Sequence, residues 1–118
     1  MTSNDFPTFR FRVLPYYDSA HKYFVAQCLE TGSITTAEDS ETVMEMMVEL
    51  LEDEASYAVK HDNLGNLYSA PAPKDVWNEW VSRAKKFGVD YRSLNVKREK
   101  VTLDDTDPSA QVELARSE

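Results

Sequence analysis

Between residues 40 and 60, apolar side chains recur every three or four positions, which is the spacing of one face of an α-helix. The acidic side chains of the same stretch fall on the opposite side. Asp39 or Ser40 can cap the start of this helix, and the segment 62–66 breaks the pattern, so the helix is expected to end near His61. Its wide apolar face is fit to cover a sheet. That face consists of Met44, Val48, Leu51, Ala55 and Ala58, widened by Val43, Met47 and Leu50.

Three segments before this helix have the patterns of strands. Residues 9–17 alternate apolar and polar side chains, and residues 23–30 are rich in aromatic and β-branched side chains. The segment 18–22 supplies a turn between them. Gly32 can adopt a positive φ in the next turn, and residues 33–37 can form a short third strand. The chain therefore predicts a three-stranded antiparallel meander.

The second half predicts one more helix and one more strand. Prolines in the segment 69–73 impose an extended link, because each disfavours helix at the residue before it. Residues 74–87 predict a helix with Trp77 and Trp80 on its core side and Gly88 as its stop, and residues 91–103 alternate again as a fourth strand. The polar segment 104–118 is expected to be a disordered tail. We therefore expect one α+β domain over residues 1–103, ordered β-β-β-α-α-β, with the long helix covering one face of the sheet.

Composition narrows the functional classes. The chain has 118 residues and a formal charge of -8, which disfavours contact with nucleic acid phosphates or anionic membranes and favours a basic partner. No apolar run approaches the roughly 18 residues of a membrane span, and the first residues lack the pattern of a signal peptide. Cys28 is the only cysteine, which excludes an internal disulfide and predicts a small buried side chain. These features predict a cytoplasmic protein.

The chain offers little for catalysis. Two-metal nucleases need carboxylates that converge on ions about 4 Å apart, whereas Asp18 is expected in a turn and Glu49 on the outer side of the helix. His21 and His61 have no second ligand at metal-binding spacing, and the 3 glycines are not spaced to cradle a phosphate. We therefore expect no enzyme, no metal and no cofactor. The carboxylates considered for such a site are Asp18, Glu30, Glu49 and Asp53.

The order of strand, strand, strand, helix and proline-containing link resembles the HicB-like antitoxin family, whose core is a small partial RNase H-like α+β domain. The likeness lies in "YFVAQCLE" (23–30), "ITTAEDSETVMEMMVELLEDEA" (34–55) and "APAPKDVWNEW" (70–80), and it extends roughly over residues 9–85. Many members carry an additional DNA-binding module of two helices. Residues 89–118 are too few for such a module beside the expected strand.

The resemblance implies a non-catalytic protein that binds and occludes a small basic partner, in the family a HicA-type mRNA-cleaving toxin. The acidic side of the long helix suits such a partner, because complementary charge speeds encounter and helps exclude wrong partners. The predicted partner-binding residues are Glu41, Glu45, Glu49, Glu52 and Asp53.

A basic segment over residues 83–100 leaves an alternative open, namely a nucleic-acid-binding regulator. The same residues also suit a solvated helix end followed by an edge strand that its charges keep from aggregating. They are equally able to meet the acidic helix of a second copy, and the fourth strand is able to extend a neighbour's sheet, so a homodimer is expected. The basic residues are Arg83, Lys85, Lys86, Arg92, Lys97, Arg98 and Lys100.

Overall fold

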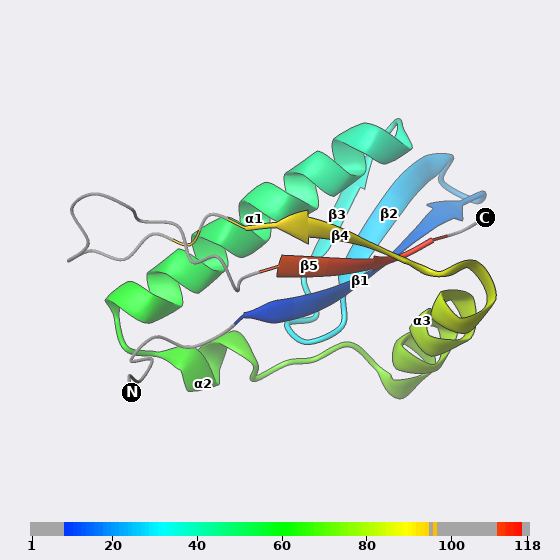
Figure 1. The fold of residues 1–118 in the computed structure, drawn as a ribbon. Coiled ribbons are helices and arrows are strands. Elements are labelled where there is room, and N and C mark those ends of the chain that lie inside the picture. The colour runs from blue at the N-terminus through cyan, green and yellow to red at the C-terminus, as the bar shows by residue number, and fades with distance from the viewer. Residues whose placement is uncertain (1–8, 95, 97–110, 117–118) are drawn as a thin grey trace.

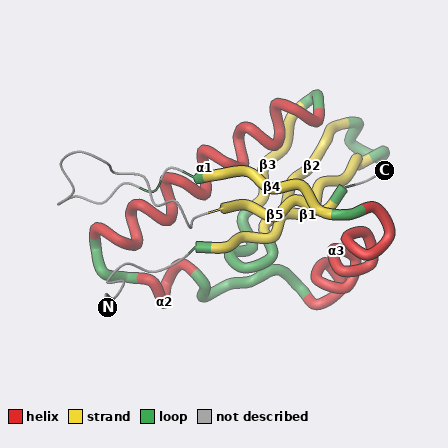
Figure 2. Tube along the Cα trace, in the orientation of Figure 1, coloured by secondary structure: helices red, strands yellow, loops and turns green. Residues whose placement is uncertain are grey.

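A five-stranded mixed sheet in the order β3-β2-β1-β5-β4 forms the centre of the structure (Figure 1). The computed structural model describes residues 9–94, 96 and 111–116. A long helix packs against one face of the sheet, and a second helix packs on the other face (Figure 2). The elements are β1 (Arg10–Asp18), β2 (Tyr23–Cys28), β3 (Ile34–Ala37), α1 (Ser40–Lys60), α2 (Leu64–Leu67), α3 (Lys74–Phe87), β4 (Val89–Ser93) and β5 (Gln111–Ala115).

The meander predicted from the first 37 residues is confirmed. β1 pairs with β2 and β2 pairs with β3, both antiparallel. Gly32 lies in the second turn with a φ of 78°, a conformation that glycine adopts without steric cost. A Cβ atom at Gly32 would lie 2.2 Å from the carbonyl oxygen of Ala70. A larger residue is therefore excluded, because the proline-containing link passes directly against this turn.

The predicted long helix is also confirmed. Asp39 is its N-cap, and α1 runs from Ser40 to Lys60. Met47 and Leu51 are fully buried against the sheet, and complete burial of such a side chain contributes about 1.5–3 kcal/mol. The buried positions of α1 are Val43, Met44, Met47, Leu51, Ala55 and Ala58.

The prediction of a disordered tail over residues 104–118 is wrong for residues 111–115. These residues form β5, which lies parallel to β1 on one side and antiparallel to β4 on the other. Val112 is fully buried and Leu114 nearly so, because both face α1 from an interior strand. The core therefore extends beyond the predicted boundary at residue 103. Residues 104–110 and 117–118 lie outside the described part of the chain.

The predicted fourth strand is present, but its bounds differ. β4 begins at Val89 and ends at Ser93, while Leu94 and Val96 are buried in the core outside the strand. Residues 97–103 lie outside the described residues. Because Val89 pairs with Ala115, β4 is the outer strand of a hairpin whose inner strand is β5.

The opposite face of the sheet is covered by α3 at one end. Trp80 is buried there with Leu14, Leu29 and Ala115, while Trp77 is half-buried and packs against the same cluster. This agrees with the predicted core side of the second helix. Among the described residues, no helix combines the length and apolar character that a bilayer span requires.

Candidate functional site

The outward side of α1 carries a row of carboxylates that we call the acidic ridge, formed by Glu41, Glu45, Glu49 and Asp53. All four side chains are exposed. A spacing of four residues corresponds to a rise of about 6 Å along the helix axis, so the ridge extends over about 18 Å. Within the described residues, none of the four side chains forms an ion pair or a hydrogen bond. Among the described residues, the ridge is therefore a row of negative charges without ion-pair partners.

Two neighbouring acids are excluded from the ridge by their surroundings. Glu52 is one of the predicted partner-binding residues, but it is half-buried and has an interaction of its own. Glu54 is also half-buried, and its two carboxylate oxygens accept hydrogen bonds from the Ser33 hydroxyl at 2.9 and 3.0 Å. The structure thus aligns four of the five predicted partner-binding residues.

The start of the ridge is fixed by the cap of α1. The carboxylate of Asp39 accepts hydrogen bonds from the backbone N–H of Thr42 at 2.7 Å and from the Thr42 hydroxyl at 2.9 Å. These bonds lower the pKa of Asp39, because they favour the ionised form. Thr35 adds a second anchor, since its hydroxyl donates to the Val43 carbonyl at 3.1 Å and ties β3 to α1. The ridge therefore projects from a well-anchored helix end.

The four described members of the predicted basic set differ in their surroundings. Arg83 is half-buried, donates to the Pro15 carbonyl and pairs with Glu79 at 3.1 Å. Lys85 and Lys86 are exposed in the last turn of α3. Arg92 is exposed on β4. Lys97, Arg98 and Lys100 lie outside the described residues, so nucleic-acid binding by this segment stays a prediction.

Arg83 and Arg92 both line a cavity of about 610 Å³ beside the N-terminal end of α1. Arg116 also lines it and pairs with Asp90 at 2.6 Å. The cavity is therefore lined by both arginines and carboxylates, and the pair with Asp90 already compensates part of the positive charge. Arg116 is not among the predicted site residues, because a single arginine in a polar segment carries no sequence signal. The other lining residues are Pro15, Tyr16, Tyr17, Phe24, Ser40, Glu41, Met44, Leu114 and Ala115.

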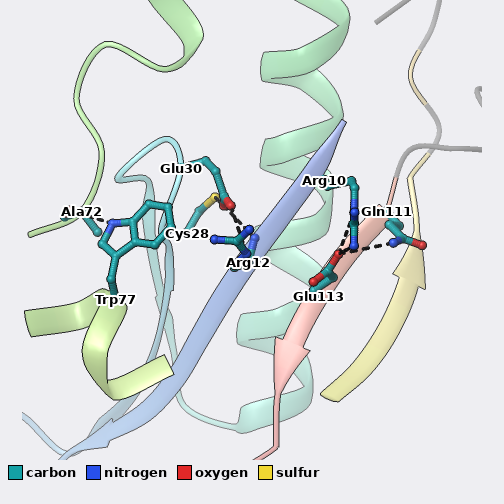
Figure 3. Close-up of polar contacts among 8 residues, drawn as sticks. All are labelled: Arg10, Arg12, Cys28, Glu30, Ala72, Trp77, Gln111 and Glu113. Atoms are coloured by element: carbon teal, nitrogen blue, oxygen red, sulfur yellow. Dashed lines mark hydrogen bonds and ion pairs between the residues drawn. The ribbon is translucent and has the colours of Figure 1, made fainter. Parts of the chain in front are cut away.

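A polar cluster lies on the sheet face opposite α1 (Figure 3). Arg10 donates to the carboxylate of Glu113 at 2.6 and 2.9 Å. Beside this pair, the guanidinium of Arg12 lies 5.3 Å from the ring centroid of Trp77 and 3.6 Å from Glu30. Each buried charge in this cluster has a partner, which indicates a structural role. The alternation in residues 9–17 places Arg10 and Arg12 on this face but does not identify their acidic partners.

The cluster contains no activated nucleophile. Burial raises the pKa of Glu30, and the backbone N–H of Arg12, 2.7 Å from its carboxylate, opposes that shift. Burial also raises the pKa of the Cys28 thiol to about 11, so the thiol stays protonated at neutral pH. This agrees with the predicted buried cysteine.

Within the residues that the structure describes, no group of three or more His, Cys, Asp or Glu side chains is arranged to hold a metal ion. Asp18 instead closes a turn, where it accepts backbone N–H groups of Ala20 and His21 at 3.0 and 3.1 Å. The imidazole of His21 lies 3.0 Å from the same carboxylate. His21 is thus engaged in the predicted hairpin turn.

Comparisons of this chain with protein-family models, with curated proteins and with solved structures found no match. The structure itself shows a compact α+β domain with an acidic helix packed on a five-stranded mixed sheet.

Proposed function

We propose that this chain is a non-catalytic HicB-like protein, an antitoxin or antitoxin-derived module, that binds and occludes a small basic partner such as a HicA-type mRNA-cleaving toxin. The observation that carries the proposal is the acidic ridge on α1, whose four carboxylates are exposed and unpaired among the described residues. The ridge lies within the stretch that resembles the family, since residues 23–55 include β2, β3 and most of α1.

The charge arrangement on α1 favours a basic partner energetically. Carboxylates four residues apart on a helix repel one another by about 0.2–0.5 kcal/mol per pair. A basic partner removes this repulsion and is attracted before contact, which raises the association rate. Cationic side chains about 6 Å apart would match the ridge, as on one side of a helix or at alternate positions of a strand.

Apolar side chains beside the ridge supply contacts that charge alone lacks. Met46 is 41% exposed and Tyr57 is 61% exposed, and both project from the outward side of α1. They are three helical turns apart, so they lie on the same flank of the ridge. Methionine and aromatic residues are enriched where protein interfaces become fully buried. We therefore expect Met46 and Tyr57 to supply apolar contacts along one flank of the interface and the carboxylates to supply charged contacts beside them.

The test is to look for a small basic protein encoded beside this chain and to measure its binding. A ridge variant, E45Q/E49Q/D53N, is compared with a matched variant, E38Q/D62N/D75N, which removes the same charge from other exposed carboxylates. Asp62 has a φ of 52°, which asparagine adopts readily, so the second variant retains its backbone. We expect the ridge variant to associate about tenfold more slowly at low salt and the matched variant to behave nearly as wild type.

Two results would contradict the proposal. One is equal loss of binding in both variants, which would assign the effect to net charge instead of the ridge. The other is the absence of any encoded or associating small basic protein in the native host, because occlusion requires a partner.

A further inference from the structure

β4 is an edge strand whose outer backbone groups face away from the rest of the described sheet (Figure 1). The N–H of Arg116 donates to the carbonyl of Gly88 at 3.0 Å, which fixes the phase of the β4 and β5 ladder. Bonding alternates along an antiparallel pair, so Asp90 and Arg92 direct their backbone groups to β5. Val89, Tyr91 and Ser93 therefore direct theirs outward.

The sequence of β4, Val-Asp-Tyr-Arg-Ser, is complementary to itself in charge. When two copies of this strand run antiparallel and are centred on Tyr91, Asp90 of one copy lies opposite Arg92 of the other. The two Tyr91 residues face each other, and Val89 lies opposite Ser93. A one-residue shift of this register would destroy the charge match, so a single arrangement is favoured.

We propose that β4 is an interface with a second copy of this chain, formed by antiparallel pairing of the two β4 edges about a two-fold axis at Tyr91. The outward backbone groups of Val89, Tyr91 and Ser93 then complete their hydrogen bonds across the interface. Asp90 and Arg92 fall at the positions of the ladder without backbone bonds, where opposing side chains approach most closely.

The side chains available in one copy fit this arrangement. Arg92 is exposed and has no ion pair within the described residues. Asp90 binds Arg116 through Oδ1 at 2.6 Å, and its Oδ2 atom is the one left for a second cation. Tyr91 is 61% exposed on a sheet, and a cross-strand pair of aromatic rings would cover both copies equally. In an ordinary edge strand, charged side chains discourage pairing with another chain. β4 differs, because its charged side chains are complementary to those of a second copy.

The other free edge does not offer the same match. β3 has four residues, Ile34–Ala37, none of them charged. Pairing of β4 with β3 of another copy would be head-to-tail and would build open chains instead of a closed dimer. In the β4 pairing, the two-fold axis is perpendicular to one continuous sheet, so both α1 helices lie on the same face. The dimer would then present two acidic ridges on one side, whether or not the proposed partner exists.

The experiment measures the mass of the full chain by light scattering and by sedimentation over a range of concentrations. Wild type is expected to approach twice 13.5 kDa, with a dissociation constant in the micromolar range that is typical of a short interface. R92D and D90R each place like charges opposite one another, so each is expected to weaken the dimer at least tenfold. An equimolar mixture of R92D and D90R is expected to restore it, because every facing pair is then of opposite charge.

Two further variants separate pairing from folding. Y91P removes an N–H that points outward, so it should prevent dimerisation and leave the ladder with β5 intact, as judged by circular dichroism. K85D makes the same charge change as R92D at an exposed position on α3 and should dimerise as wild type does. A wild type that remains monomeric, an assembly larger than a dimer, or an R92D variant that dimerises normally would overturn the proposal. So would failure of the mixture to restore the dimer.

Discussion

Arg10 and Glu113 are 103 residues apart in the sequence, yet the Nη2 atom of Arg10 lies 2.6 Å from the Oε2 atom of Glu113. The pair joins β1 to β5, which are the first and last strands of the described residues. Its two members differ in environment, since the side chain of Arg10 is 63% exposed and that of Glu113 is 9% exposed. The carboxylate therefore depends on the arginine more than the arginine depends on the carboxylate.

Arg10→Ala is expected to lower the free energy of unfolding by about 1–3 kcal/mol, because it leaves a buried carboxylate without its cation. Adding Glu113→Gln should recover part of that loss, since an uncharged amide is less costly to bury. Arg116→Ala is the control. Its pair with Asp90 is also 2.6 Å long, but both side chains are about half exposed, so the expected loss is below about 0.5 kcal/mol. Urea unfolding measures all three, and equal losses in R10A and R116A would contradict the dependence on burial.

The position of β5 in the sheet gives a sharper test of the fold. Val112→Asp places an unpaired charge at a fully buried site between β1 and β4, and the expected loss is on the order of 4 kcal/mol or complete unfolding. Val81→Asp makes the same change at a side chain on α3 that is 43% exposed, so it should cost little. A V112D variant as stable as wild type in a thermal melt would show that β5 is not part of the folded core.

Local periodicity is sufficient to predict most of the fold. The alternation in β1 and the three- and four-residue spacing in α1 each recur often enough to identify the element and its buried face. β5 repeats its pattern only through Val112 and Leu114, within a polar segment, so alternation there is too short to outweigh composition. What makes it a strand is the backbone of β1 and β4 on either side, and that pairing is not visible in a local window.

The acidic ridge and the basic segment also differ in how far the sequence predicts them. The acidic ridge follows from helix spacing alone, so the sequence is enough to assign Glu45 and Glu49 to an exposed side of α1. The basic segment runs from a helix into a strand, so its spacing in the sequence does not show which of its described side chains share a surface. Arg83 contacts the Pro15 carbonyl, and the pairing of Asp90 with Arg116 depends on the β4 and β5 hairpin. Such long-range partners require the tertiary structure.

Asp39 should make the stability of α1 dependent on acidity. Hydrogen bonds from the Thr42 backbone and hydroxyl lower the pKa of Asp39 below its ordinary 3.8. The stabilisation is therefore fully present above pH 3.8 and is lost as pH falls through the lower value of the folded state. Asp39→Asn caps the helix without titrating, so wild type should lose melting temperature relative to D39N as pH falls below about 4.

Thr42→Val serves as the companion variant for this prediction. It removes the hydroxyl bond at 2.9 Å but retains the backbone bond at 2.7 Å. The melting-temperature difference from D39N that develops at low pH should therefore be smaller for T42V than for wild type, but still present. A constant difference between wild type and D39N across the pH range would mean that the cap does not hold the ionised carboxylate.

Cys28 should be chemically inert in the folded protein. Its side chain is fully buried and its pKa is raised to about 11, so only about one thiol in a thousand is ionised at pH 8. Reaction with a thiol reagent should then require unfolding, and its rate should rise with urea in parallel with the unfolded fraction. Ser19→Cys, which adds a thiol in the exposed turn after β1, should react at once in the same protein. If Cys28 reacted in native buffer as fast as that exposed cysteine, the packing of β2 beneath α1 would be wrong.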